Sequence, residues 1–213
     1  MTAPLGFVVG LAAEARIARS LGLVAVGGGL PAGAERAAEA LVAAGAQGLI
    51  SFGLAGGLDP TFRPGDIIIP AMVRAGDVDY PTSDLVGAAA GLLLAGTTII
   101  ATKAAKQALF QATSAAAIDL ESGAVAQVAQ RYNLPFAVLR AICDPAERDL
   151  PPAALSALNH NGAIGLWRVF ASIAANPGQI PNLIALAQDA AHARRALLNA
   201  AQRMNWRNAV PVP

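Results

Sequence analysis

The chain has little of what several kinds of site require. Among its 213 residues it has one cysteine, Cys143, and two histidines, His160 and His192. A single cysteine excludes an internal disulfide and fits a reducing compartment, and two histidines are too few to favour a histidine-based metal site. Cys143 lies in an apolar segment, so we interpret it as a packed thiol rather than a nucleophile. The sequence therefore predicts a cytoplasmic protein without a metal centre.

Charge is equally scarce, because charged residues make up 14% of the chain and the formal net charge is +1. Such a balance leaves no electrostatic footprint for nucleic acid. The small cluster Arg194-Arg195 fits a solvated helix face, with an anion-binding patch as the alternative. The longest apolar stretch, Gly87–Ala101, is interrupted by glycines and threonines and falls short of the roughly 18 residues of a membrane span. Residues 1–4 lack a basic segment, so we expect no signal peptide.

Hydrophobic residues, at 55% of the chain, are abundant, and apolar segments alternate with helical ones. The expected strands are Leu5–Gly10, Leu23–Val26, Gln47–Ser51, Asp66–Ile69, Thr97–Ala101, Ala116–Ile118 and Phe136–Ile142. The expected helices are Ala12–Leu21, Ala32–Ala44, Lys103–Gln111, Glu121–Tyr132, 153–174 and 181–205. This alternation predicts a single α/β domain over residues 1–205, with a mostly parallel sheet between two helical layers, and a tail over 206–213.

Ligands of such sheets bind at the carboxyl ends of the strands, and polar residues gather there. Those at or near expected strand ends are Ser51, Thr102, Asp119 and Asp144. The segment Ser51–Leu58 is predicted to end a buried strand in a turn with three glycines, whose N–H groups can face a ligand.

A second glycine-rich segment, Gly27–Ala32, matches the G-x-G-x-x-A pattern of dinucleotide sites. A dinucleotide site would also have an acidic residue at the end of the next strand, where this chain has Ser51. Nicotinamide binding is therefore disfavoured. The remaining interpretations are an anion or ribose held by the backbone N–H groups, with Gly28 in contact, and a plain tight turn.

Three carboxylates stand where chemistry is expected. Glu14 and Glu121 each lie at the start of a helix, where the helix dipole alone would favour them. Asp144 follows an apolar strand, where it could equally cap a helix. Arg140 lies on the same face of that strand, and an arginine among apolar residues pairs with an acid or with a bound anion.

Three segments resemble the purine nucleoside phosphorylase and nucleosidase superfamily. Ser51–Leu58 followed by Gly65–Ile69 is similar to its glycine-rich loop and next strand. Ile118–Ala124 is similar to its ribose-binding turn, and Phe136–Asp144 to its strand with the pattern P-F-x-x-x-R-x-I-S-D. Gly10–Arg16 also resembles the methylthioadenosine and adenosylhomocysteine nucleosidase branch.

The C-terminal part, from Asp144–Pro152 onward, resembles the hopanoid-associated phosphorylases. The resemblance implies a nucleoside phosphorylase-like α/β/α fold with a mixed sheet, and cleavage of the N-glycosidic bond of a purine nucleoside to release adenine. The implied substrate is adenosylhopane, an intermediate of hopanoid biosynthesis. The alternatives are a methylthioadenosine or adenosylhomocysteine nucleosidase, and a non-catalytic protein that binds a nucleoside or a lipid.

The resemblance also implies a role for each site residue. Asp144 would donate a proton to N7 of the purine, and Glu14 would lie near the nucleophile, so these two are the predicted catalytic residues. The predicted ribose contacts are Glu121 and Leu120, and the predicted base contacts are Thr102 and Asp119. Phosphate or the nucleophile would contact Arg140, Gly53, Leu54 and Gly28.

Some features depart from the family pattern. Leu54 replaces a hydroxyl or small polar residue, the segment Asp77–Gly96 is short, and Lys103 stands where small residues are common and either grips phosphate or is solvated. Phosphorolysis and hydrolysis therefore both remain open. The resemblance implies no cofactor beyond inorganic phosphate as co-substrate, a homodimer, and transient membrane contact if the substrate is a lipid.

Overall fold

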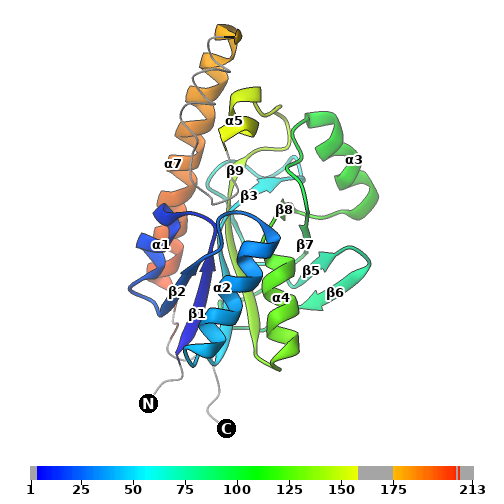
Figure 1. Ribbon diagram of the computed structural model, residues 1–213. Coiled ribbons are helices and arrows are strands. Elements are labelled where there is room, and N and C mark those ends of the chain that lie inside the picture. Colours follow the sequence, from blue (N-terminus) through cyan, green and yellow to red (C-terminus); the bar gives the residue numbers. More distant parts are fainter. Residues whose placement is uncertain (1–3, 158–174, 205, 207–213) are drawn as a thin grey trace.

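A computed structural model describes residues 4–157, 175–204 and 206 (Figure 1). Its strands are β1 Leu5–Val9, β2 Leu23–Val26, β3 Gly48–Gly57, β4 Ile67–Ile68, β5 Met72–Ala75, β6 Val78–Pro81, β7 Leu92–Ala95, β8 Ala117–Asp119 and β9 Phe136–Asp144. Its helices are α1 Ala12–Ala18, α2 Pro31–Ala43, α3 Lys103–Thr113, α4 Ser122–Arg131, α5 Pro152–Ala157, the 3₁₀ helix Pro177–Gln179 and α7 Ile180–Arg203.

The described strands form one mixed sheet in the order β2-β1-β3-β8-β7-β5-β6, and β9 pairs with β3 and β4. The β1–β2, β1–β3, β3–β9, β5–β7 and β7–β8 pairs are parallel. The β3–β8, β4–β9 and β5–β6 pairs are antiparallel. The mostly parallel mixed sheet predicted for the family is therefore confirmed.

Helices cover both faces of this sheet, which gives three layers (Figure 1). Side chains alternate along each strand, so Val8 faces the core under α2 and α4, whereas Phe7 and Val9 face the core under α1 and α7. Alanines line both helix layers, as at Ala34 and Ala193, and let helix and sheet approach closely. Because β3 and β9 are parallel neighbours, their carboxyl ends lie side by side at the same end of the sheet.

The predicted turn in Ser51–Leu58 is wrong, because β3 continues through Gly57. Its second half pairs with β9 on one side and with β8 at its end, and this central position outweighs the poor strand propensity of glycine. The predicted strand Thr97–Ala101 is also wrong, because the strand at this place is β7, Leu92–Ala95. The β5–β6 hairpin was not predicted.

The C-terminal helices differ in part from the expectation. Helix α5 begins at Pro152, and the rest of the predicted helix 153–174 lies outside the described residues after 157. Helix α7 closely matches the predicted helix 181–205. No described helix is long and apolar enough to cross a membrane.

Trp206, which the sequence assigns to the tail, is partly buried and packs against the core under α1 and α7. Its ring packs edge-on against Phe7 with centroids 5.1 Å apart, and its indole Nε1 donates a hydrogen bond to the carbonyl of Ala201 at 2.6 Å. Residues 207–213 lie outside the described part of the chain.

We predict that Trp206→Ala lowers the free energy of unfolding by about 2–4 kcal/mol, because it removes a large apolar contact and a hydrogen bond. Urea denaturation followed by circular dichroism measures this. Tyr132→Ala is the control, because Tyr132 is 48% exposed and its removal changes stability little. Equal effects of the two substitutions would show that Trp206 belongs to the tail.

Candidate active site

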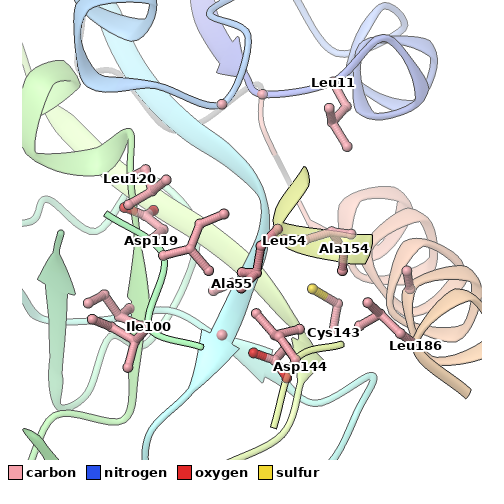
Figure 2. A pocket seen from close by; sticks show the side chains of 18 of the residues that line it. Leu11, Leu54, Ala55, Ile100, Asp119, Leu120, Cys143, Asp144, Ala154 and Leu186 are labelled. Atoms are coloured by element: carbon pink, nitrogen blue, oxygen red, sulfur yellow. The ribbon is translucent and has the colours of Figure 1, made fainter. Parts of the chain in front are cut away.

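A cavity of about 600 Å³ opens at the carboxyl ends of β3 and β9 (Figure 2). Its polar walls carry the side chains of Glu14, Asp119, Glu121 and Asp144. Most of the remaining wall is apolar, with Leu11 before α1, Leu54 in β3, Ile100 before α3, and Ala154 and Leu186 from α5 and α7. Acidic groups and a large apolar wall therefore share one space.

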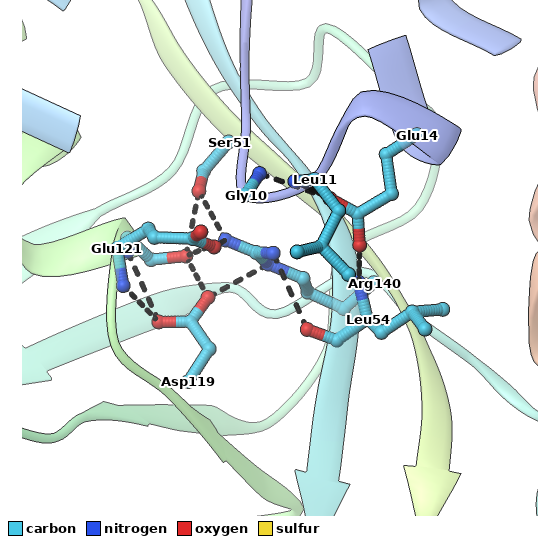
Figure 3. Close-up of polar contacts among 9 residues, drawn as sticks. Gly10, Leu11, Glu14, Ser51, Leu54, Asp119, Glu121 and Arg140 are labelled. Atoms are coloured by element: carbon cyan, nitrogen blue, oxygen red, sulfur yellow. Dashed lines mark hydrogen bonds and ion pairs between the residues drawn. The ribbon is translucent and has the colours of Figure 1, made fainter. Parts of the chain in front are cut away.

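Arg140 lies at the centre of an acidic cluster, with Ser51, Asp119 and Glu121 around its guanidinium (Figure 3). It is fully buried in β9, and the residues on either side of it in this strand, Leu139 and Ala141, are buried and apolar. Its Nε lies 2.7 Å from Asp119 Oδ2 and its Nη2 lies 2.8 Å from Glu121 Oε2. Nη2 also donates to Ser51 Oγ at 2.7 Å, and Nη1 donates to the carbonyl of Leu54 at 3.3 Å. The guanidinium of Arg140 therefore binds carboxylate, hydroxyl and carbonyl groups of the protein itself.

Asp119 braces the turn between β8 and α4. Its Oδ1 accepts the N–H groups of Glu121 and Ser122 at 3.2 and 3.0 Å, so it caps the start of α4. Its Oδ2 accepts the hydroxyl of Ser122 and pairs with Arg140. Because both oxygens are engaged, Asp119 fixes Glu121 rather than offering itself to a ligand.

Glu14 turns its carboxylate back over the end of β1. Oε2 accepts the N–H groups of Gly10 and Leu11 at 2.9 and 2.8 Å, and Oε1 accepts that of Leu54 at 3.1 Å. A helix start favours a carboxylate at this place, and the bond to Leu54 ties α1 to the end of β3. The side chain is 2% exposed and lines the cavity.

Two glycines let these groups come together. A Cβ atom on Gly10 would lie 2.2 Å from Glu121 Oε1. A Cβ atom on Gly53 would lie 2.7 Å from Arg140 Nη1 and 2.8 Å from Glu14 Oε1. Any larger residue at either position would push the acids and the arginine apart.

Burial sets the proton affinities of this cluster. It raises the pKa of Glu121 from its ordinary value of 4.5 to about 7, with repulsion from Glu14 and Asp119 added and Arg140 opposing. It also raises the pKa of Glu14, against Arg140 and three backbone N–H groups. Burial alone would lower the pKa of Arg140, but the surrounding carboxylates outweigh it and raise that pKa. The cluster holds more acid than its single arginine neutralises.

Asp144, the last residue of β9, makes a separate contact. Its Oδ2 lies 2.7 Å from Nζ of Lys106, a lysine of α3 that is 1% exposed, whereas its buried Oδ1 has no hydrogen-bond partner in the described structure. Burial raises the pKa of Asp144, and Lys106 opposes this. The neighbouring Cys143 lines the cavity and is partly buried against the core under α1 and α7. Burial raises the pKa of its thiol to about 12, which disfavours the thiolate that a nucleophile requires.

The structure brings together Glu14, Leu54, Asp119, Leu120, Glu121 and Asp144 as cavity walls, with Arg140 and Gly53 against them. Thr102 lies elsewhere: it is exposed, and its hydroxyl caps α3 by accepting the N–H of Ala105. Gly28 lines a separate hollow beside Arg36, and Gly29 lines the cavity instead. Neither Thr102 nor Gly28 is positioned for the contact predicted for it.

Lys106 was not predicted as a site residue, because a lysine within a helix carries no local sign of burial. Ser122, whose hydroxyl donates to Ser51 Oγ at 3.0 Å, was not predicted either. Arg194 is half-buried and lines the cavity, whereas Arg195 and Lys103 are exposed. The predicted solvated face thus describes Arg195 but not Arg194.

We predict that Glu121→Gln stabilises the fold at high pH. The folded-state pKa of Glu121 lies above its unfolded value, so its proton stabilises the fold fully below pH 4.5, and this stability is lost as the pH rises through about 7. The rise of the pKa of Glu121 from 4.5 to about 7 corresponds to a free energy of ~3 kcal/mol. Glutamine avoids this loss, so the free energy of unfolding should rise by about 1–3 kcal/mol at pH 8.5 and change little at pH 4.5.

Chemical denaturation of wild type and variant at both pH values measures this difference. Glu39→Gln, at a partly exposed position of α2 where Glu39 pairs with Arg131, is the control and should change stability little at either pH. A gain that is the same at pH 4.5 and 8.5 would contradict the burial of an unneutralised carboxylate at Glu121.

The sequence of this chain is similar to those of known proteins. The Phosphorylase superfamily profile matches residues 17–90 and 86–163. The 5′-methylthioadenosine/S-adenosylhomocysteine nucleosidase of Shewanella baltica is 30% identical over 135 residues, which cover 48% of this chain and 57% of that protein. That of Shewanella putrefaciens is also 30% identical, with 58% of its length covered. The match thus spans little more than half the length of these relatives.

Solved structures agree on the fold. A 5′-methylthioadenosine/S-adenosylhomocysteine nucleosidase from Colwellia psychrerythraea, in complex with adenine, has a TM-score of 0.62 at 16% identity, over 81% of this chain and 96% of that one. The futalosine hydrolase of Helicobacter pylori has a TM-score of 0.65 at 17% identity, over 95% of this chain and 98% of that one. With this fold, and with a profile match over more than half of its length, the chain belongs to the Phosphorylase superfamily, as its three motifs predict.

Proposed function

We propose that this protein cleaves the N-glycosidic bond of a 5′-substituted adenosine by hydrolysis and releases adenine. One observation carries the proposal: a single cavity has a buried carboxyl with a free oxygen at Asp144 and two further buried carboxylates at Glu14 and Glu121. Nucleoside cleavage requires an acid for the base and negative charge near the sugar, and this cavity offers both.

The purine leaves as the bond between N9 and C1′ breaks and its electron pair moves onto the base. Asp144 Oδ1 gives a proton to N7, which makes the base a better leaving group. The raised pKa of Asp144 keeps a larger share of this carboxyl protonated near neutral pH. Positive charge then develops on the sugar, where the carboxylates of Glu14 and Glu121 stabilise it.

Glu121 and Leu120 form the proposed ribose contacts. Arg140 fixes Oε2 of Glu121 at 2.8 Å, so the carboxylate has a defined orientation towards sugar hydroxyls. Leu120 lines the cavity beside it and offers an apolar surface to the sugar ring. We assign Asp119 to holding this turn rather than to the base contact expected from the sequence.

Hydrolysis is favoured over phosphorolysis by the charge balance of the acidic cluster around Glu14, Asp119 and Glu121, although Arg194 of α7 also lines the cavity. Arg140 is occupied by Asp119 and Glu121, and phosphate would be repelled by the surplus of carboxylates. Glu14 can instead accept a proton from a water molecule that attacks C1′, because burial makes it a stronger base. No cofactor is required by this scheme.

The apolar wall supports a bulky apolar substituent at the 5′ position. Leu183, Leu186 and Ala190 of α7 line the cavity together with Ala153 and Leu155 of α5. Adenosylhopane is the substrate implied by the C-terminal resemblance. Its hopane group would pack along this apolar wall, and its delivery would require transient membrane contact.

Methylthioadenosine and adenosylhomocysteine are the second candidate substrates. The relatives that are 30% identical to this chain over the matched residues are nucleosidases of these two compounds, which supports this candidate. The homodimer implied by the family resemblance remains a prediction.

We predict that Asp144→Asn lowers kcat for adenine release by about 10²–10⁴-fold, the usual contribution of a general acid. Chromatography of free adenine after incubation with 5′-substituted adenosines measures this, with and without phosphate. Asp77→Asn, at an exposed turn between β5 and β6, is the control and should keep wild-type activity. Release that requires phosphate would contradict hydrolysis, and no release by wild-type protein would indicate a non-catalytic binder.

We predict that Ala190→Phe separates substrates by size. The new ring would fill part of the cavity beside the apolar wall and take the space of a long 5′ substituent. The kcat/KM should therefore fall at least about tenfold for an adenosine with a decylthio group and by less than about threefold for methylthioadenosine. Ala191→Phe, at the next and exposed position of α7, is the matched control. An equal loss for both substrates would place the 5′ substituent elsewhere.

A further inference from the structure

We propose that Lys106 is a positioning residue for Asp144: its ammonium holds Oδ2, leaves Oδ1 to the purine, and controls the pH at which this carboxyl gives up its proton. The inference rests on the proposed function and names a residue that the three motifs do not include.

The ammonium group of Lys106 has no donor left for a ligand. An ammonium has three N–H donors, and Nζ lies 2.7 Å from Asp144 Oδ2, 3.0 Å from the carbonyl of Pro145 and 2.9 Å from that of Arg148. Although Lys106 lines the cavity, it can therefore act on a substrate only through Asp144. This geometry makes it a positioning residue rather than a substrate contact.

The carboxyl of Asp144 is left asymmetric by this contact. Oδ2 is fixed by Lys106, whereas Oδ1 is buried and has no partner among the described residues. A buried acceptor without a partner costs about 1–3 kcal/mol, so its persistence points to a partner that a ligand supplies. A purine N7 that shares a proton with Oδ1 would be such a partner.

Several charged groups face Asp144. Lys106 of α3 contacts it directly, and Arg148 in the following loop lowers its pKa more weakly, whereas Asp189 of α7 raises it. Arg148 is itself paired with Asp189, and Arg194 of α7 also lines the cavity. Lys106 is thus the cation that most directly opposes the effect of burial on Asp144.

This opposition has a consequence for the reaction. When Asp144 has given its proton to N7, a buried carboxylate remains, and Lys106 stabilises it. Without the lysine, the carboxyl would hold its proton more tightly and would donate it more slowly. The alkaline limit of activity, set by loss of that proton, would then move to higher pH.

A purely structural role for Lys106 is the competing explanation, because the same region is tied together by other bonds. The N–H of Lys103 donates to Asp149 Oδ1 at 2.6 Å, and the N–H of Leu150 donates to the carbonyl of Ala101 at 2.7 Å. Loss of a structural tie would lower stability but would leave the pH limit of the remaining activity unchanged. The pH profile therefore separates the two explanations.

The test compares Lys106→Met with wild type and with Lys103→Met, which alters an exposed lysine of the same helix. For Lys106→Met, kcat should fall about 10–100-fold with little change in KM, and the alkaline limit should rise by about one pH unit or more. Lys103→Met should match wild type. A folded Lys106→Met protein with the wild-type pH limit would overturn the proposal.

A second measurement does not depend on activity. In protein labelled with ¹³C at aspartate carboxyls, with Asp144→Asn to assign the signal, the Asp144 carboxyl should titrate about one unit or more higher in Lys106→Met, or in Lys106→Gln if the methionine variant does not fold. An unchanged titration would overturn the role of Lys106. Failure of wild-type protein to release adenine would overturn the proposed function alone.

In wild-type protein, the ¹³Cε signal of Lys106 should respond at the pH where Asp144 titrates. The absence of that response would also contradict the coupling, even if neither variant folds.

Discussion

The site depends on one buried arginine. Arg140 is removed from water in the central part of the sheet, so it must find acids there, and Asp119 and Glu121 provide them at 2.7 and 2.8 Å. Its guanidinium is rigid and planar, and it therefore fixes the positions of the groups around it. Because Glu14 is added to this cluster, acid exceeds base, and burial keeps the proton affinity of Glu121 high.

Such a cluster is costly for stability but useful for chemistry. A folded protein without a ligand gains little from buried carboxylates that a single arginine cannot neutralise, whereas a cation-like sugar would relieve their repulsion. Asp144 is organised differently, because Lys106 holds one oxygen and leaves the other without a partner. In the proposed reaction, the two ends of the cavity match the two charges that form when a nucleoside is cleaved.

Much of this could be predicted from the sequence, for identifiable reasons. The apolar segments around Leu5, Leu23 and Phe136 are bounded by turn residues, so their strands were found at nearly the observed positions. The motif residues Glu121 and Asp144 lie on the cavity wall because β8 and β9 both end beside the last residues of β3, although β8 reaches them from the opposite direction.

What could not be predicted depends on contacts between distant segments. The strand character of Gly53–Gly57 arises from β9 and β8, and the path of 97–101 is set by the pairing of β7 with β5 and β8. The ammonium of the buried Lys106 donates to two carbonyls about 40 positions further along the chain, which no local pattern indicates.

The most direct test of the central claim is a crystal structure with a non-cleavable adenosine analogue bound. The account predicts N7 about 2.6–3.2 Å from Asp144 Oδ1 and ribose hydroxyls on Glu121. A purine bound away from Asp144, with its sugar distant from Glu14 and Glu121, would contradict it.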